Sequence, residues 1–264
     1  DLHSFPTRRS SDLHIGEALA NAQKAAGILD KNHPDIPKLF SNIGSAYWGL
    51  KDFQYALKYQ AEAVRLDEQL MDNGQALEPH DQLYFDLCRT YFSMKNYDEA
   101  LNILKKLSES CKNCFWVHKD ILQRTTSLIY YNTGRQLYSE KKYKTAIPYL
   151  EIFITFPDSI VSKLNYLNCI NLIGISFAKS GNMQEAKKAF TKYDNQKADL
   201  GRSNRNWALY YALEHDPEKA IDHLYKAVAA GYRDIEWITT EEGLNTIRND
   251  ERYIKLIDSL KGNK

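Results

Sequence analysis

Five pairs of small residues, each separated by twelve positions, constrain the fold of this chain more than any other feature. The pairs are Gly44 and Ala56, Cys88 and Ala100, Gly134 and Ala146, Gly174 and Ala186, and Ala208 and Ala220. Three residues after each first member stands an aromatic residue or leucine: Tyr47, Tyr91, Leu137, Phe177 and Tyr211. Small side chains let two helices approach closely where they cross, and a large neighbour fills the space beside the crossing. The pattern predicts an all-α solenoid of five antiparallel helix pairs.

Apolar residues around each pair recur at the spacing of a helix face. Near Gly44, the residues Phe40, Ile43 and Tyr47 follow the i, i+3, i+7 pattern of an amphipathic helix. Polar stretches such as Ser-Gly-Asn at 180–182 and His-Asp-Pro at 215–217 lie between the two members of a pair and predict turns. No stretch alternates long enough to predict a strand.

The repeated segment resembles the tetratricopeptide repeat, a helix pair of 34 residues with the pattern W-x2-L-G-x2-Y…A-x3-F. Gly174, Phe177, Ala186 and Phe190 follow this pattern, for example. Successive alanine anchors lie 44, 46, 40 and 34 residues apart, so the first three intervals are longer than in the family. The stretch LFSNIGSAYWGLKDFQYAL resembles the longer repeats of the kinesin light chain type, which also occur in bacterial regulators. The resemblance implies a right-handed superhelical α-solenoid over residues 36–231.

The two ends of the chain differ from these repeats. Residues 1–13 resemble a translated sequencing adapter and are expected to be non-native. Residues 14–35 are predicted to be the second helix of a repeat whose first helix was lost, so that the array is a fragment. Residues 232–264 resemble a closing segment of bacterial tetratricopeptide proteins and are predicted to form a helical cap. Its expected apolar face consists of Leu244, Ile247, Tyr253, Ile254, Ile257 and Leu260.

Charge and cysteine content narrow the function classes. The net charge of +1 argues against direct nucleic-acid binding, and no run of about 18 apolar residues predicts a membrane span. Cys111, Cys114 and His118 offer three potential ligands, whereas a structural zinc site takes four, and a redox CxxC requires a strand that leads into a helix. An inter-repeat loop is therefore expected there, with no metal and no cofactor. Sparse cysteine suits a reducing compartment and predicts a cytoplasmic protein.

The resemblance further implies that the first helix of each pair lines a concave groove. Two consecutive repeats carry the same aromatic, arginine, aromatic row at its groove positions: Phe85, Arg89 and Phe92, then Tyr131, Arg135 and Tyr138. The groove is expected to extend over Lys38, Trp48, Asn168 and Asn171, with Lys179 and Arg205 beyond them. Arginine pairs with carboxylates and aromatic rings offer apolar contact, so the partner is predicted to be an acidic peptide or protein segment.

Two further interpretations of these residues stay open. The aromatic side chains could serve inter-repeat packing, and the arginines could meet neighbouring carboxylates. The lysine and asparagine clamp of chaperone-binding members is not matched, because Ser41 and Ser45 stand at those positions.

Since no GxSxG, HExxH, P-loop or GxGxxG motif occurs, we expect a non-enzymatic interaction scaffold. The alternatives are the C-terminal regulatory or sensory region of a larger signalling protein or enzyme, and an exported, membrane-associated adaptor.

Overall fold

The computed structural model describes residues 33–75, 80–110 and 119–262, with six single helical positions between residues 16 and 28. The adapter-like residues 1–13 and the Cys111, Cys114 and His118 trio lie outside the described residues. Within these ranges all regular structure is helical, which confirms the predicted all-α class. The truncated repeat at 14–35 stays a prediction.

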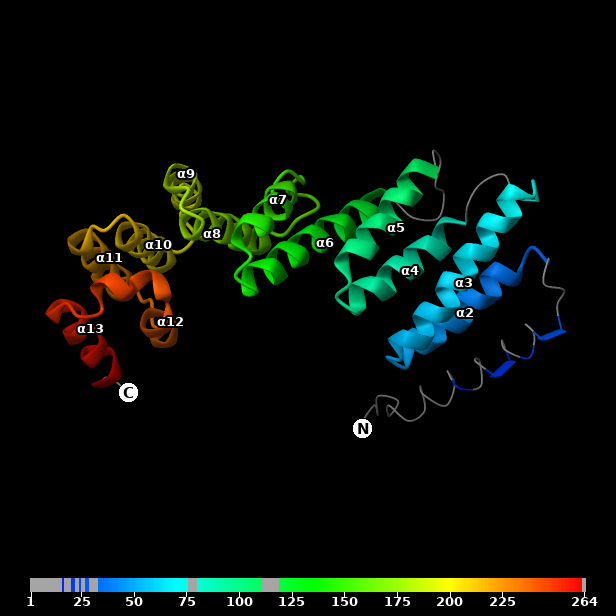
Figure 1. Cartoon of the computed structure of the whole chain (residues 1–264), viewed down its shortest axis with the longest axis horizontal. Coiled ribbons are helices and arrows are strands. Elements are labelled where there is room, and N and C mark those ends of the chain that lie inside the picture. The colour runs from blue at the N-terminus through cyan, green and yellow to red at the C-terminus, as the bar shows by residue number, and fades with distance from the viewer. Residues whose placement is uncertain are drawn as a thin grey trace, which may run out of the picture. The chain divides into compact units, whose positions relative to one another are not determined.

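Ten helices form the five predicted pairs (Figure 1). They are α2 (Ile36–Gly49) with α3 (Phe53–Asp72), α4 (Asp81–Ser93) with α5 (Tyr97–Ser110), α6 (Lys119–Ser139) with α7 (Tyr143–Phe153), α8 (Lys163–Lys179) with α9 (Met183–Asp194), and α10 (Leu200–Leu213) with α11 (Pro217–Ala229). The closing segment contains α12 (Ile235–Thr240), the 3-10 helix η1 (Glu242–Ile247) and α13 (Glu251–Gly262). The chain divides into two compact units, an N-terminal unit (Asp1–Ile129) and a C-terminal unit (Tyr130–Lys264).

The small pairs lie where the two helices of a hairpin cross, as predicted. The alanine partners Ala56, Ala100, Ala146, Ala186 and Ala220 are completely buried. A Cβ atom added to Gly134 would lie 2.5 Å from the Leu150 side chain, and one added to Gly174 would lie 2.4 Å from the Phe190 ring. Leu150 and Phe190 thus each fill the notch that a glycine leaves on the facing helix. Any side chain larger than that of glycine would overlap them at these positions.

Each hairpin turn contains one residue in the left-handed conformation, seven positions after the first small residue. These residues are Lys51, Lys95, Lys141, Gly181 and His215, with φ between 59° and 83°. In the fourth turn, the backbone N–H of Asn182 donates to the Phe177 carbonyl at 2.9 Å, and the Asn182 side chain then caps α9. Asp52 and Asp216 act in the same way, so one turn both ends a helix and begins the next.

These turns allow a test of backbone strain. Replacing Lys95 with glycine is expected to stabilise the chain by about 1 kcal/mol, since a left-handed conformation strains every residue with a Cβ atom. Gly181→Ala is expected to destabilise it by a similar amount. Urea unfolding followed by circular dichroism measures both changes. Lys95→Ala is the control, because it removes the side chain and keeps the strain; a Lys95→Gly chain no more stable than this control would contradict the prediction.

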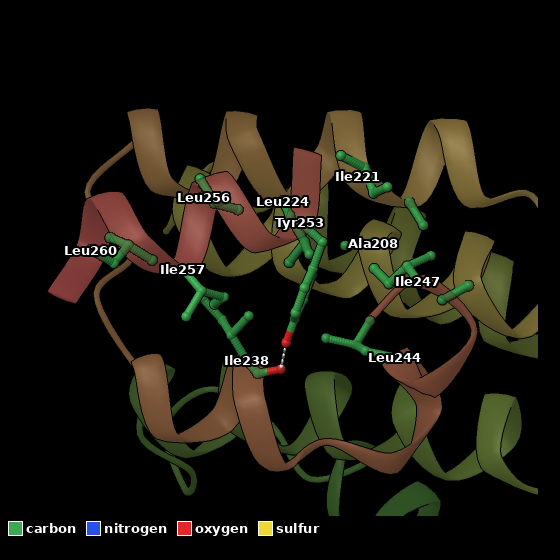
Figure 2. Packing of buried hydrophobic residues seen from close by; sticks show 12 residues of the cluster. Ala208, Ile221, Leu224, Ile238, Leu244, Ile247, Tyr253, Leu256, Ile257 and Leu260 are labelled. Carbon is green, nitrogen blue, oxygen red and sulfur yellow. Dashed lines mark hydrogen bonds between the residues drawn. The ribbon is translucent and has the colours of Figure 1, made fainter. Parts of the chain in front are cut away.

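The closing segment packs against the last hairpin and forms one apolar cluster with it (Figure 2). Ile238, Leu244 and Ile247 are completely buried, and the Tyr253 hydroxyl donates to the Ile238 carbonyl at 2.9 Å. One expected member of this face was wrong: Ile254 is 48% exposed, and Leu256 is buried in its place. The reason is that α13 turns a face centred on Tyr253, Leu256, Ile257 and Leu260 toward α10 and α11.

Candidate functional site

In the N-terminal unit, the predicted groove residues Trp48 and Arg89 contact each other. The Arg89 guanidinium lies 4.3 Å from the centre of the Trp48 ring, and the Trp48 indole N–H donates to Ser93 Oγ at 3.1 Å. Arg89 also pairs with Asp86 of its own helix at 3.2 Å. This arginine is therefore engaged by its own neighbours, which leaves less of its charge for a partner.

Asp86 is the centre of that cluster. Its carboxylate accepts hydrogen bonds from Ser41 at 3.2 Å and from Gln82 at 3.1 Å, and burial raises its pKa above the usual value. Ser41 and Ser45, which stand where chaperone-binding members carry their clamp, thus lie beside the carboxylate of Asp86 in the same unit. The other predicted residues of this unit, Phe85 and Phe92, are half-buried, and Lys38 is exposed.

In the C-terminal unit, the three predicted residues of α6 have different environments. Tyr131 is buried, with its ring 4.9 Å from that of Phe153, so it serves mainly as a core residue. Arg135 is exposed and lies 5.3 Å from the Tyr131 ring centre. Tyr138 packs edge-on against Tyr143, and burial raises the pKa of Tyr138 to about 12. Of this row, Arg135 remains open to a partner.

Two asparagine–arginine contacts join α8 to α10. Arg202 donates to Asn168 Oδ1 at 3.2 Å, and Arg205 donates to Asn171 Oδ1 at 2.8 Å. The members of each pair lie 34 residues apart, which is one repeat of the family. We call the surface formed by Arg135, Asn168, Asn171, Arg202 and Arg205 the polar face. Arg202 was not among the residues predicted from the sequence, although its 34-residue distance from Asn168 indicates the contact.

Arg205 is a buried cation without a carboxylate. Its side chain lies 4.6 Å from the Trp237 ring centre, and its Nη2 donates to the amide oxygens of Asn171 and Asn206. Only 8% of the residue is exposed, and no carboxylate of the described residues lies within 4.0 Å of it. Its buried Nε has no hydrogen-bond acceptor in the described part of the chain. Burying an uncompensated charge costs free energy, so an anion is the natural complement of this site.

A pocket of about 490 Å³ opens beside Arg205. Its lining includes Arg202 and Asn171 together with Tyr232 and Arg233, which follow α11. Burial raises the pKa of the Tyr232 hydroxyl. The lining of the pocket therefore combines three arginines with two aspartates, Asp199 and Asp234.

The closing segment covers the neighbouring part of the same surface. Glu241 forms an ion pair with Lys179, and the two side chains are only 9% and 11% exposed. Trp237, one turn before Glu241, covers Arg205. Lys179, which was expected to extend the groove, is thus occupied by a residue of the chain itself.

These features define a class of protein: a helical-repeat chain in which polar side chains join the first helices of neighbouring pairs, as between α8 and α10. The tetratricopeptide repeat family model matches residues 37–70 and 81–114, so the chain contains tetratricopeptide repeats. Proteins built from these repeats act as interaction scaffolds for other proteins.

Several known proteins are similar to the chain. The clustered mitochondria protein homolog of Brugia malayi is 26% identical over 184 residues, which are 63% of this chain and 12% of that protein. YrrB, described as a TPR protein with an unusual peptide-binding site, is 18% identical, with coverage of 84% and 97% of the two chains and a TM-score of 0.49. BtubC (BKLC) from P. vanneervenii is 14% identical, with coverage of 86% and 94% and a TM-score of 0.45. The chain therefore spans about an eighth of the length of the Brugia protein.

Two further properties concern the described residues alone. None of their helices combines the length and the apolar character needed to cross a bilayer. Nor do three of their histidine, cysteine, aspartate or glutamate side chains gather in a group that could hold a metal ion.

Proposed function

We propose that this chain is a non-enzymatic scaffold that binds an acidic segment of a partner protein on the polar face of its C-terminal unit. The observation that carries the proposal is Arg205, a buried guanidinium held by two amide oxygens and no carboxylate of the described residues. A partner carboxylate would supply the missing charge through a charge-assisted hydrogen bond.

The rest of the polar face supports the same partner chemistry. Arg202 and Arg135 are exposed, and both could reach an extended acidic segment. The amide groups of Asn168 and Asn171 already hold the two arginines of α10, so these cations are positioned before a partner arrives. Preorganised side chains lose less conformational entropy on binding.

The N-terminal row of Phe85, Arg89 and Phe92 contributes less in this proposal. Arg89 is already paired with Asp86 and stacked on Trp48. A continuous groove across the second and third repeats stays a prediction of the sequence.

A charge-reversal experiment tests the acidic partner. We expect Arg135→Glu/Arg202→Glu to lower the affinity for a fluorescent nine-residue peptide library with three fixed glutamates by at least tenfold, because two attractive charges become repulsive. Fluorescence anisotropy at low and at physiological salt measures the affinity, and the wild-type interaction should weaken as salt rises. A matched library with three fixed lysines should bind poorly to the wild type.

The control variant reverses two lysines that lie away from the polar face. Lys255 and Lys261 are exposed on α13, so Lys255→Glu/Lys261→Glu changes the net charge equally and should leave the affinity near the wild-type value. Unchanged binding of the acidic library by folded Arg135→Glu/Arg202→Glu would refute the proposal, as would equal binding of both libraries to the wild type.

A second candidate is that this surface is a regulatory region of a longer protein. It is favoured by the match to the Brugia protein, in which the matched region is a small part of the whole. The polar face would then bind an acidic segment of the same polypeptide. Adding the longer protein's remaining segments in trans and measuring whether they displace the acidic library would separate the two candidates.

A further inference from the structure

We propose that the pocket beside Arg205 binds a phosphoryl group, carried by a phosphorylated serine or threonine of the partner segment. This inference rests on the proposed function and adds the chemical group that the pocket selects. The pocket is bounded by α8, α10 and the connection from α11 to α12, and its volume of about 490 Å³ leaves room for a phosphorylated side chain.

Three guanidinium groups line this pocket. Arg205 is buried and its Nε–H has no acceptor in the described residues. Arg202 borders the pocket from the first turn of α10. Arg233 is held in place because its Nη1 donates to the Val228 carbonyl at 2.5 Å and to the Tyr232 carbonyl at 3.0 Å.

Two carboxylates also line the pocket, and both are already engaged. Asp199 accepts the backbone N–H of Arg202 at 2.8 Å and pairs with its guanidinium at 3.3 Å. Asp234 accepts the backbone N–H of Trp237 at 2.9 Å, which begins α12. Asp199 therefore neutralises Arg202 in part, whereas Arg205 and Arg233 form no ion pair with a carboxylate of the described residues.

The number of donors favours a phosphoryl group over a carboxylate. A carboxylate offers two oxygens and one charge, whereas a phosphorylated side chain offers three acceptor oxygens and a charge of about −1.5 to −2 at neutral pH. All three oxygens can accept hydrogen bonds in this pocket. The donors are Arg205 and Arg233, which have no carboxylate partner among the described residues, the partly neutralised Arg202, and the amide of Asn171.

Arg205 is also preorganised for this role. Its guanidinium is fixed between the Trp237 ring on one side and two asparagine oxygens at its Nη2. Clusters of arginines that are held rigidly in this way are the usual means by which proteins recognise phosphorylated motifs. The closing segment thus contributes a wall of the pocket through Tyr232 and Arg233, and its Trp237 holds the Arg205 guanidinium from behind that wall through ring stacking.

The first test observes Arg205 directly. We expect titration of the full chain with inorganic phosphate to shift the arginine Nε–H resonance of Arg205 in a saturable way, in ¹⁵N–¹H spectra at constant ionic strength. Sodium chloride at the same ionic strength should not produce a saturable shift. Arg205→Lys assigns the resonance, since it removes that signal alone.

The second test uses nine-residue peptide libraries with phosphoserine, glutamate or serine fixed at the centre. We expect the phosphoserine library to bind at least tenfold more tightly than the glutamate library. Arg233→Gln should lower the phosphoserine affinity at least fivefold, and the exposed position of Arg233 leaves the fold intact. Arg252→Gln on α13 is the matched control and should bind as the wild type does.

The outcomes separate this inference from the proposed function. Equal affinity for the phosphoserine and glutamate libraries, or wild-type binding by Arg233→Gln, would overturn the phosphoryl site and leave the acidic docking surface standing. Absence of binding by all acidic libraries would overturn both. A saturable phosphate shift at Arg205 together with selective phosphoserine binding would support both.

Discussion

Replacing Phe190 with alanine is expected to lower the free energy of unfolding by about 3–5 kcal/mol. The Phe190 side chain is completely buried, and its ring fills the notch above Gly174 on the facing helix. The ring also lies 6.0 Å from that of Trp207, so the change opens a cavity between the fourth and fifth repeats. Urea unfolding followed by circular dichroism measures the loss.

The same contact can be tested from the other side. Gly174→Ala places a Cβ atom 2.4 Å from the Phe190 ring, and we expect overpacking to cost about 1–3 kcal/mol. Gly262→Ala near the end of α13 is the matched control, since no atom lies within 4 Å of the added Cβ. A loss below about 1 kcal/mol for Phe190→Ala would show that the notch is not a packed crossing.

Removing one partner of the Lys179–Glu241 pair is expected to cost about 3 kcal/mol or more, because the other charge is left almost completely buried. Lys179→Met leaves the Glu241 carboxylate with the Gly243 backbone N–H at 2.8 Å as its one remaining donor among the described residues. The double variant Lys179→Met/Glu241→Gln should recover part of the loss, since no net charge then remains at the site. A double-mutant cycle in urea measures this coupling.

The control is the neighbouring pair of Lys141 and Glu242. Both side chains of that pair are 65% exposed, so water screens them and Lys141→Met should have no measurable effect. If Lys179→Met were equally harmless, the closing segment would be only loosely attached, and it could not serve as a fixed wall of the pocket.

The local sequence pattern predicted the helices, their pairing and their turns because these depend on residues close together in the chain. The spacing from Gly174 to Ala186 placed the crossing, and Ser180-Gly181-Asn182 placed the turn that connects α8 to α9. The same pattern predicted most of the apolar face of α13. It failed at Ile254, because which residues of an amphipathic helix become buried depends on how the helix is rotated against its neighbour.

The candidate site was predicted less completely than the fold. A residue's position in the repeat indicates that it lies on the groove side, but it does not indicate which other side chains of the chain pack against it. Tyr131 was expected to face a partner and is a core residue packed on Phe153. Lys179 was expected to be available and is covered by Glu241, 62 residues further along the chain. Arg202 was not expected at all, although it lies beside Asn168.

The sequence by itself thus determined the class of fold, since the repeated small residues and left-handed turns act within a single hairpin. Only the tertiary structure decided which cations remain without a carboxylate. Arg89 is paired by Asp86 on its own helix, whereas Arg205 is buried beneath Trp237 and held by Asn171 of another repeat. The physical reason is that burial and charge pairing depend on side chains brought together across helices, which no local pattern specifies.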